Sequence, residues 1–187
     1  MLKPFRRAGA LVLILASAAA TITAPAAPAA PAAPAAGAEG PESTDPPRPA
    51  DLVELRRRPS LEGEEMVGVF KVRVDPDQSD LRRVQLWEQR GSKVVISTDV
   101  LRCAPTAPSR LTGRSGPAGR QLVLRSLNPG GPITSANRLD HLVWWAACAP
   151  ELAGRDPAEL VQEARRRGFQ GGLVEREEIL PAPPSAR

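Results

Sequence analysis

Apolar and polar residues alternate in four short runs in the middle of the chain, and a period of two predicts β-strands. The first run covers residues 65–74, EMVGVFKVRV. Strict alternation places Phe70 and Val72 on one face of this strand. Val69 and Arg73 then fall on the opposite face. An Asp-Pro-Asp sequence follows and is expected to end the strand.

The next two runs predict a hairpin. Residues 83–88 and 93–97 flank a Gln-Arg-Gly-Ser segment, in which glycine supplies the turn conformation. The fourth run, residues 120–127, predicts another strand, and the Asn-Pro-Gly-Gly-Pro sequence that follows breaks regular structure. Residues 104–119 are rich in proline, serine and glycine, so we expect a loop there.

In the C-terminal third the apolar period changes to three and four, which predicts helices. The first helix is expected to begin at a cap formed by Thr134 or Ser135 and to run to about Cys148. Its apolar stripe consists of Ala136, Leu139, Leu142, Val143 and Ala146. We expect this stripe to face the sheet.

A second helix is predicted from the Asp-Pro-Ala-Glu sequence at residues 156–159. Asp156 can accept hydrogen bonds from the first-turn amides, and the proline suits the first helical position. The helix is expected to end at Gly168, and Phe169 supplies the apolar residue typical of a glycine-terminated helix. Residues 173–180 are compatible with a last short strand.

Together these elements predict an α+β fold with a small antiparallel sheet of three to four strands, followed by two helices packed on one face of the sheet. Residues 51–180 are sufficient for a single domain. Residues 181–187 are expected to be a disordered tail.

Residues 1–20 have the pattern of a secretory signal peptide, with three basic residues before an uncharged apolar stretch. A membrane-spanning helix needs about 20 apolar residues, so this shorter stretch suits a cleavable signal better. We predict cleavage after Ala20 and export by the general secretory route to the periplasm or the exterior. An N-terminal membrane anchor is the alternative, because the uncharged stretch continues to Ala24.

Residues 21–50 are rich in alanine and proline and include a repeated Pro-Ala-Ala unit. Such a segment cannot bury enough apolar surface to offset its ordering entropy. It is therefore predicted to be a disordered linker, which becomes a free N-terminal tail if the signal is cleaved and a spacer if the signal is retained.

The net charge depends on the signal. The whole chain has 25 basic and 21 acidic residues, a net charge of +4, but cleavage leaves 22 basic residues and a net charge of +1. This removes the argument for a nucleic-acid partner that the high isoelectric point suggests.

Arginine runs at 56–58 and 165–167 leave binding to an anionic glycan open. That hypothesis requires a clustered basic face, and scattered arginines paired with acids would argue against it.

The two cysteines, Cys103 and Cys148, are predicted to form a disulfide, because an even number of cysteines in an exported chain is typical of one. The bond would close a loop of about 45 residues and add up to roughly 4 kcal/mol of stability. A redox-active pair is the alternative, but no CxxC spacing supports it.

His141 is the single histidine of the chain and the candidate catalytic residue. Adjacent residues on a helix point about 100° apart, so Asp140 is not expected to orient it. If Cys148 is bonded to Cys103, the connecting loop would cover the helix side that carries His141. The pattern therefore favours a structural role for this histidine over a catalytic one.

Trp144 and Trp145 are adjacent, so their side chains diverge and at most one is expected in the core. Core packing is the favoured interpretation of the pair. An exposed tryptophan near Arg138 is the candidate binding site, because such a ring can stack on a sugar or a peptide.

No metal site or cofactor is expected. One histidine and two bonded cysteines cannot form a zinc cluster, which leaves carboxylates alone. The acidic runs at 62–65 and 175–178 lack the spacing of a calcium loop and are predicted to be solvated. No G-x-S-x-G or S-x-x-K motif indicates a serine nucleophile.

These patterns predict an exported, disulfide-bonded domain that acts as a binding or structural module of the cell envelope or the extracellular space. Its expected partner is a protein or glycan of that compartment, with no nucleic acid, and a membrane only if the signal is uncleaved. The alternative is a small hydrolase-like enzyme that uses His141 with an acid or hydroxyl from elsewhere in the fold.

Overall fold

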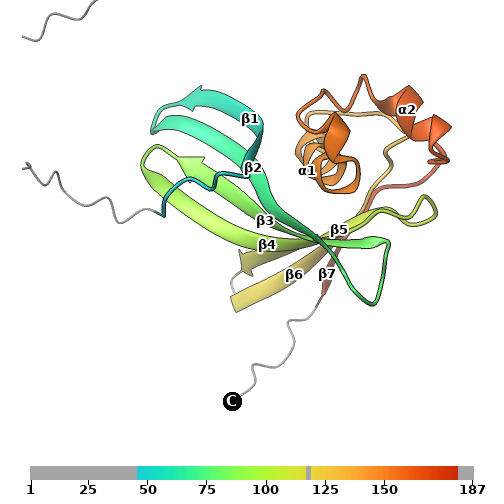
Figure 1. The fold of residues 1–187 in the computed structure, drawn as a ribbon, viewed down its shortest axis with the longest axis horizontal. Coiled ribbons are helices and arrows are strands. Elements are labelled where there is room, and N and C mark those ends of the chain that lie inside the picture. Colours follow the sequence, from blue (N-terminus) through green and yellow to red (C-terminus); the bar gives the residue numbers. More distant parts are fainter. Residues whose placement is uncertain (1–45, 117–118, 181–187) are drawn as a thin grey trace, which may run out of the picture. The chain divides into compact units, whose positions relative to one another are not determined.

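A computed structural model describes residues 46–116 and 119–180 (Figure 1). Its strands form one antiparallel sheet in which each strand pairs with the next along the chain. They are β1 (Val53–Ser60), β2 (Gly63–Val74), β3 (Leu81–Arg90), β4 (Lys93–Arg102), β5 (Ser109–Gly116), β6 (Gly119–Ser126) and β7 (Arg176–Leu180). The helices are α1 (Arg138–Cys148) and α2 (Val161–Arg166), with a 3₁₀ turn at Pro150–Leu152 between them.

The predicted fold class is wrong. The described residues form mostly a seven-stranded antiparallel sheet with two short helices, rather than three or four strands followed by two helices. Both helices lie in the connection between β6 and β7, and β7 then returns to pair with β6. The helices are therefore an insertion in a meander, not a C-terminal layer.

Two strands escaped prediction because their sequences hide the alternation of a strand. Strand β1 contains three consecutive arginines and a proline, which is tolerated here because β1 is an edge strand. Strand β5 (SRLTGRSG) has the composition of a loop. It is nevertheless paired along its whole length with β6, so backbone hydrogen bonding decides its structure. The predicted hairpin is confirmed by the antiparallel pairing of β3 with β4.

Both helices begin later than predicted. Helix α1 starts at Arg138, after a turn in which the side chain of Asn137 accepts a hydrogen bond from the backbone N–H of Thr134 (2.7 Å). Asp156 accepts from the backbone N–H of Ala158, as expected, but residues 157–160 form turns before α2 begins. These turns are stabilised by backbone bonds between residues three apart.

The end of α2 follows the prediction closely. Gly168 has a positive φ of 91°, and its N–H donates to the carbonyl of Arg165 at 3.1 Å. The N–H of Phe169 donates to the carbonyl of Ala164 at 3.0 Å. These two bonds define a Schellman motif, which satisfies carbonyls that the helix end leaves free.

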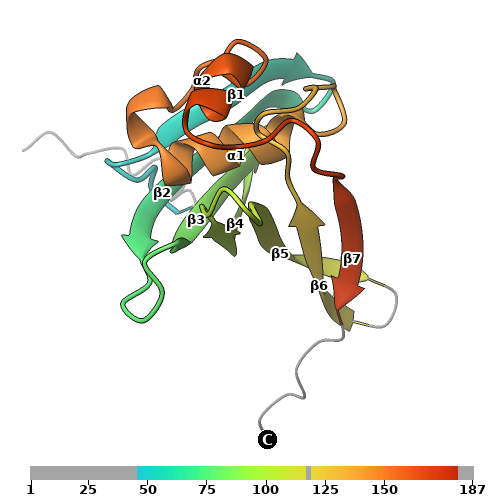
Figure 2. The same cartoon turned by 90° about the vertical axis from the view of Figure 1, so that its right-hand side faces the viewer.

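Helix α1 lies across one face of the sheet and contacts β1 to β5 (Figures 1 and 2). This inner face supplies Val67, Val69, Val84, Leu86 and Leu101 to the main core. Residues of α1 from Asp140 to Ala147 are all buried, because the segment around α2 covers the side away from the sheet. Burial on all sides explains why eight consecutive positions, rather than one stripe, are inaccessible.

The opposite, outer face of the sheet carries a second and smaller apolar cluster. Met66, Phe70 and Trp87 are buried there, with Leu52 and Val94 packed against them. Met66 and Phe70 alternate along β2 with the inner-face valines, so β2 is apolar on both faces. This explains its nearly continuous apolar sequence.

A β-bulge at Lys71 changes the faces that the sequence pattern assigned. Lys71 has a positive φ of 49°, and the pairing of β2 with β3 shifts between Phe70 and Arg73. Because the bulge inserts one residue, Arg73 pairs with Arg83 and shares the outer face with Phe70. The prediction that Arg73 lies on the face of Val69 is therefore wrong.

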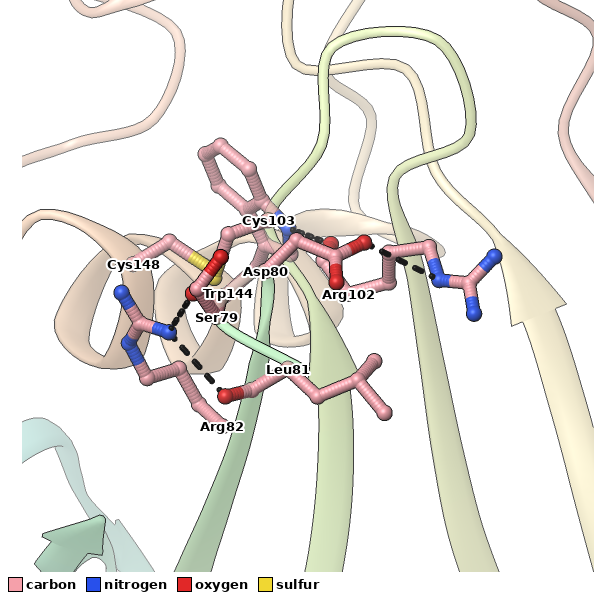
Figure 3. Close-up of a disulfide and its surroundings, with 8 residues drawn as sticks. All are labelled: Ser79, Asp80, Leu81, Arg82, Arg102, Cys103, Trp144 and Cys148. Atoms are coloured by element: carbon pink, nitrogen blue, oxygen red, sulfur yellow. Dashed lines mark hydrogen bonds and ion pairs between the residues drawn. A yellow bond between two sulfur atoms is a disulfide. The ribbon is translucent and has the colours of Figure 1, made fainter. Parts of the chain in front are cut away.

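The predicted disulfide between Cys103 and Cys148 is present, with Cα atoms 5.5 Å apart (Figure 3). It joins the end of β4 to the last residue of α1. Beside it, the indole N–H of Trp144 donates to the carbonyl of Arg102 at 2.9 Å. The backbone N–H of Cys103 donates to the carbonyl of Asp80 at 2.7 Å, which ties the β2–β3 connection to the same point.

No helix among residues 46–116 and 119–180 is long and apolar enough to cross a membrane. The predicted signal at 1–20, the linker up to residue 45 and the tail at 181–187 lie outside the described residues. The division of the chain into these segments and one domain stays a prediction.

Candidate functional site

His141 is completely buried, and its partner is an acid from a distant part of the chain. Its Nε2 lies 2.7 Å from Oε1 of Glu175, which precedes β7. The Nδ1 atom has no hydrogen-bond partner among the described residues. Glu175, from the segment before β7, is thus the hydrogen-bond partner of the ring, and cover by the loop after Cys103 stays a prediction.

Glu175 links three segments around this histidine. Its Oε1 also accepts from the backbone N–H of Asn128 at 3.0 Å, and its Oε2 accepts from the side-chain amide of Asn137 at 2.8 Å. Asn128 donates in turn to the carbonyls of Gly171 and Leu173. The carboxylate therefore fixes the start of α1 and the approach to β7 together. The prediction that the acidic run at 175–178 is solvated fails for Glu175.

A second buried polar cluster lies one residue away along α1. Arg110 is only 4% exposed and donates to Asp99 through Nε at 2.8 Å and to Asp140 at 2.7 Å. Arg125 also reaches Asp140, at 3.3 Å. Asp140 thus pairs with arginines of β5 and β6 and does not orient His141, as the helical geometry predicted.

The outer end of this cluster opens to a small cavity of about 180 Å³. It is lined by Arg125, Ser126, Leu127, Ala136, Asn137, Asp140, Glu175, Arg176 and Glu177. Arg125 donates from two nitrogens to Glu177, at 2.9 and 2.8 Å. This pairing lowers the pKa of Glu177 below its ordinary value, because the ionised form accepts both bonds.

Both tryptophans are buried, at 2% exposure for Trp144 and 1% for Trp145. Their rings pack edge to face with centroids 5.1 Å apart, and Trp144 packs against Phe169 in the same way at 5.0 Å. The expectation that at most one of them lies in the core is wrong, because the segment around α2 covers the second ring. Core packing, the favoured interpretation, describes both. A contact of either ring with a ligand stays a prediction.

Arg138 is exposed and pairs with Asp156 at 2.7 Å. This contact lowers the pKa of Asp156.

The two arginine runs of the sequence are also largely paired with acids. In the first, Arg57 bonds to Glu54 and Glu64, and Arg58 to Glu65. In the second, Arg166 and Arg167 both contact Glu163. Scattered, paired arginines argue against a broad basic face built from these runs.

The chemistry available to the site is limited. In the part of the chain that the structure describes, no group of three histidine, cysteine or acidic side chains can hold a metal ion. The carboxylates nearest His141 and Arg110 are already bound by neighbouring donors. The arrangement can hold charges in place and lock α1 on the sheet, but the hydrogen bonds that it makes are internal.

Sequence reasoning missed the partners more than the central residues. Glu175, Asp99 and Arg110 carry no motif and lie 34, 42 and 31 residues from His141 in the sequence. Arg110 follows Pro108 and Ser109 in a segment with the composition of a loop, so no sequence signal marked it as a strand residue. Because β5 was not predicted, the sequence did not indicate that Arg110 lies next to α1.

Comparisons with protein-family models, curated proteins and solved structures found no match for this chain.

Proposed function

We propose that this chain is an exported, disulfide-bonded module of the cell envelope or the extracellular space, with a binding or structural role. Its partner would be a protein or glycan of that compartment. The observation that carries the proposal is the disulfide between Cys103 and Cys148, since such bonds persist in oxidising compartments. The N-terminal signal pattern of residues 1–20 supports the same conclusion.

The state of His141 supports a non-catalytic role. A general base must reach a substrate proton within about 3 Å or through one water. His141 is fully buried, and its Nε2 is bonded to Glu175, so no substrate atom can approach that nitrogen without movement of the acid. The neighbouring ion pairs are likewise internal. This geometry suits a rigid scaffold that presents its surface to a partner.

A hydrolase-like enzyme is the second candidate, and one observation favours it. Glu175 is an acid from elsewhere in the fold that contacts His141, and the same acid lines the cavity of about 180 Å³. Movement of Glu175 would connect the histidine to that cavity. Ser126 lines the cavity and is the hydroxyl available there.

Assays of the exported protein with p-nitrophenyl esters of several chain lengths separate these two functions. The module hypothesis predicts no turnover above buffer for the wild type. Turnover that His141→Gln and Glu175→Gln both abolish, and that the exposed control Glu178→Gln retains, would establish the enzyme instead. Circular dichroism of each variant confirms that the sheet is intact.

The compartment is tested separately by expressing the full chain with a C-terminal tag in a secreting bacterial host. The proposal predicts recovery from the periplasm or the medium. Retention of the whole population in the cytosol would contradict export, whatever the outcome of the ester assays.

A further inference from the structure

Two pairs of arginines face each other directly across neighbouring strands of the sheet. Arg110 of β5 is opposite Arg125 of β6, and Arg73 of β2 is opposite Arg83 of β3. Like charges directly opposite each other destabilise a sheet. Each pair therefore needs compensation, and the two pairs differ in how much the molecule provides.

The β5–β6 pair is fully compensated by acids of the chain itself. Asp99 and Asp140 pair with Arg110, while Asp140 and Glu177 pair with Arg125. Three carboxylates thus surround two guanidinium groups. This pair is an internal structural cluster, with Arg110 almost inaccessible to solvent.

The β2–β3 pair is not compensated in this way. Asp75 pairs with Arg83, at 3.2 and 3.1 Å from two of its nitrogens. Arg73 and the nearby Lys71 have no ion pair with any described residue. The carboxylate of Asp51 accepts the backbone N–H of Lys71 at 2.9 Å, so it holds the bulge rather than the ammonium group.

These cations surround a recess on the outer face of the sheet. The recess has a volume of about 250 Å³ and is lined by Lys71, Arg73, Arg83, Val84, Gln85 and Thr98. We call it the basic recess. The bulge at Lys71 creates it, because a regular strand would direct Arg73 to the inner face. Gln85 and Thr98 face each other across β3 and β4 and add neutral hydrogen-bond donors.

We propose that the basic recess binds a dianionic phosphoryl group, either free phosphate or a phosphate monoester. This inference deepens the proposed function and depends on it only for the compartment in which the ligand is met. The guanidinium groups of Arg73 and Arg83 supply the planar forks that recognise phosphate oxygens, and Lys71 adds a point charge.

The charges of the recess select this ligand class. Three cations line it, and Asp75 pairs with Arg83 alone, so two positive charges have no ion pair among the described residues. A phosphate monoester carries about two negative charges above its second pKa, whereas a carboxylate or a phosphodiester carries one. Drug-sized ligands occupy pockets of about 300 to 1,000 Å³, so a recess of this size suits a small polar group.

Isothermal titration calorimetry of the exported, oxidised protein at about pH 8 and constant ionic strength tests the proposal. The titrants are inorganic phosphate, glycerol 1-phosphate, dimethyl phosphate and acetate. We expect binding of the first two and at least tenfold weaker binding of the last two. Equal binding of all four anions, or stronger binding of the diester, would overturn the proposal, as would no binding of inorganic phosphate and glycerol 1-phosphate.

Matched variants locate the site. Arg73→Gln is expected to weaken phosphate binding at least tenfold, while Arg90→Gln, on β3 and outside the recess, changes it less than twofold. Without phosphate, Arg73→Gln is expected to unfold at an equal or higher urea concentration than the wild type, because it removes an opposed like charge. If Arg73 were purely structural, Arg73→Gln would instead lower that midpoint and leave the phosphate affinity unchanged, which would contradict the proposal.

Failure of the phosphate-site proposal and failure of the proposed function give different experimental results. An exported, oxidised protein that binds no phosphate overturns the basic recess and leaves the module hypothesis standing. A reduced protein confined to the cytosol overturns the module hypothesis, while phosphate binding that depends on Arg73 would still support the recess.

Discussion

At the scale of single residues, the most demanding feature is the burial of Arg110 with Asp99. Asp99 is fully inaccessible, and its Oδ1 atom has no hydrogen-bond partner among the described residues. A buried ion pair adds little stability relative to an apolar pair, but an unpartnered buried charge is very costly. The cluster therefore favours one arrangement of β4, β5 and α1 over any in which these charges separate.

Replacing Arg110 by methionine should expose this cost. Arg110→Met leaves Asp99 and Asp140 without their shared partner, and we expect a loss of about 3 to 5 kcal/mol in the free energy of unfolding. Urea denaturation followed by tryptophan fluorescence measures it. Arg58→Gln, which breaks the exposed pair with Glu65, is the control and should cost less than about 1 kcal/mol. Equal losses in the two variants would contradict this account of the cluster.

Surface carboxylates should make stability depend on pH. Hydrogen bonds from Arg57, and also from Arg48, lower the pKa of Glu54 from 4.5 to about 2. Since the folded pKa lies below the unfolded one, the contribution is complete above about pH 4.5 and is lost as the pH falls towards 2. Glu54→Gln should therefore lose less stability than the wild type between pH 5 and pH 2, as measured by urea midpoints. Glu62→Gln is the control, and its urea midpoints should change with pH as those of the wild type do.

At the scale of elements, the end of α2 is the feature that the sequence specified most directly. Gly168 adopts a positive φ, and Phe169 closes the Schellman motif onto Ala164. Gly168→Ala should destabilise the protein by about 1 kcal/mol, because a Cβ atom disfavours this conformation. Gly172→Ala, where an added Cβ would contact nothing within 4 Å, is the matched control in thermal unfolding. A Gly168→Ala variant as stable as that control would show that the motif does not hold the helix end.

Elements were predictable where one local signal dominated. The strands around Leu86 and Val123 show alternation, and the strand around Phe70 is a nearly continuous apolar run. The existence of all three was predicted correctly. Strands β1 and β5 carry no such signal, since their place depends on hydrogen bonding to neighbours far along the chain. The bulge at Lys71 could not be predicted either, because a non-glycine residue with positive φ has no pattern of its own. Predicting the fold class and the basic recess would have required knowledge of these non-local features.

At the scale of the whole molecule, the disulfide links the inserted helices to the sheet. It closes a loop with a sequence separation of 45 that contains β5, β6 and most of α1. For a loop of this length, the chain-entropy model gives roughly 4 kcal/mol, with strain able to reduce it. The double variant Cys103→Ala/Cys148→Ala should lose stability on this scale in urea denaturation. The wild type with reductant should approach the same midpoint, and a change below about 1 kcal/mol in both would contradict a stabilising role.

The same bond is compatible with an extracellular or periplasmic location, since disulfides persist in oxidising compartments. The buried His141 and the arginines of β5 and β6, which pair with acids of the same chain, form the internal part of the proposed module. On the outer face, Arg73 and Lys71 form no ion pair with a described residue, and they line the proposed phosphate site. The two faces of the sheet are thus proposed to have different roles.

Intact mass of the exported protein, with and without reductant and alkylation, tests the central claim most directly. An exported module with a cleaved signal predicts a chain beginning after Ala20 that takes up no alkylating agent until reductant is added, and then takes up two groups. A full-length chain with two alkylatable thiols in the native protein would contradict both the cleaved signal and the disulfide between Cys103 and Cys148.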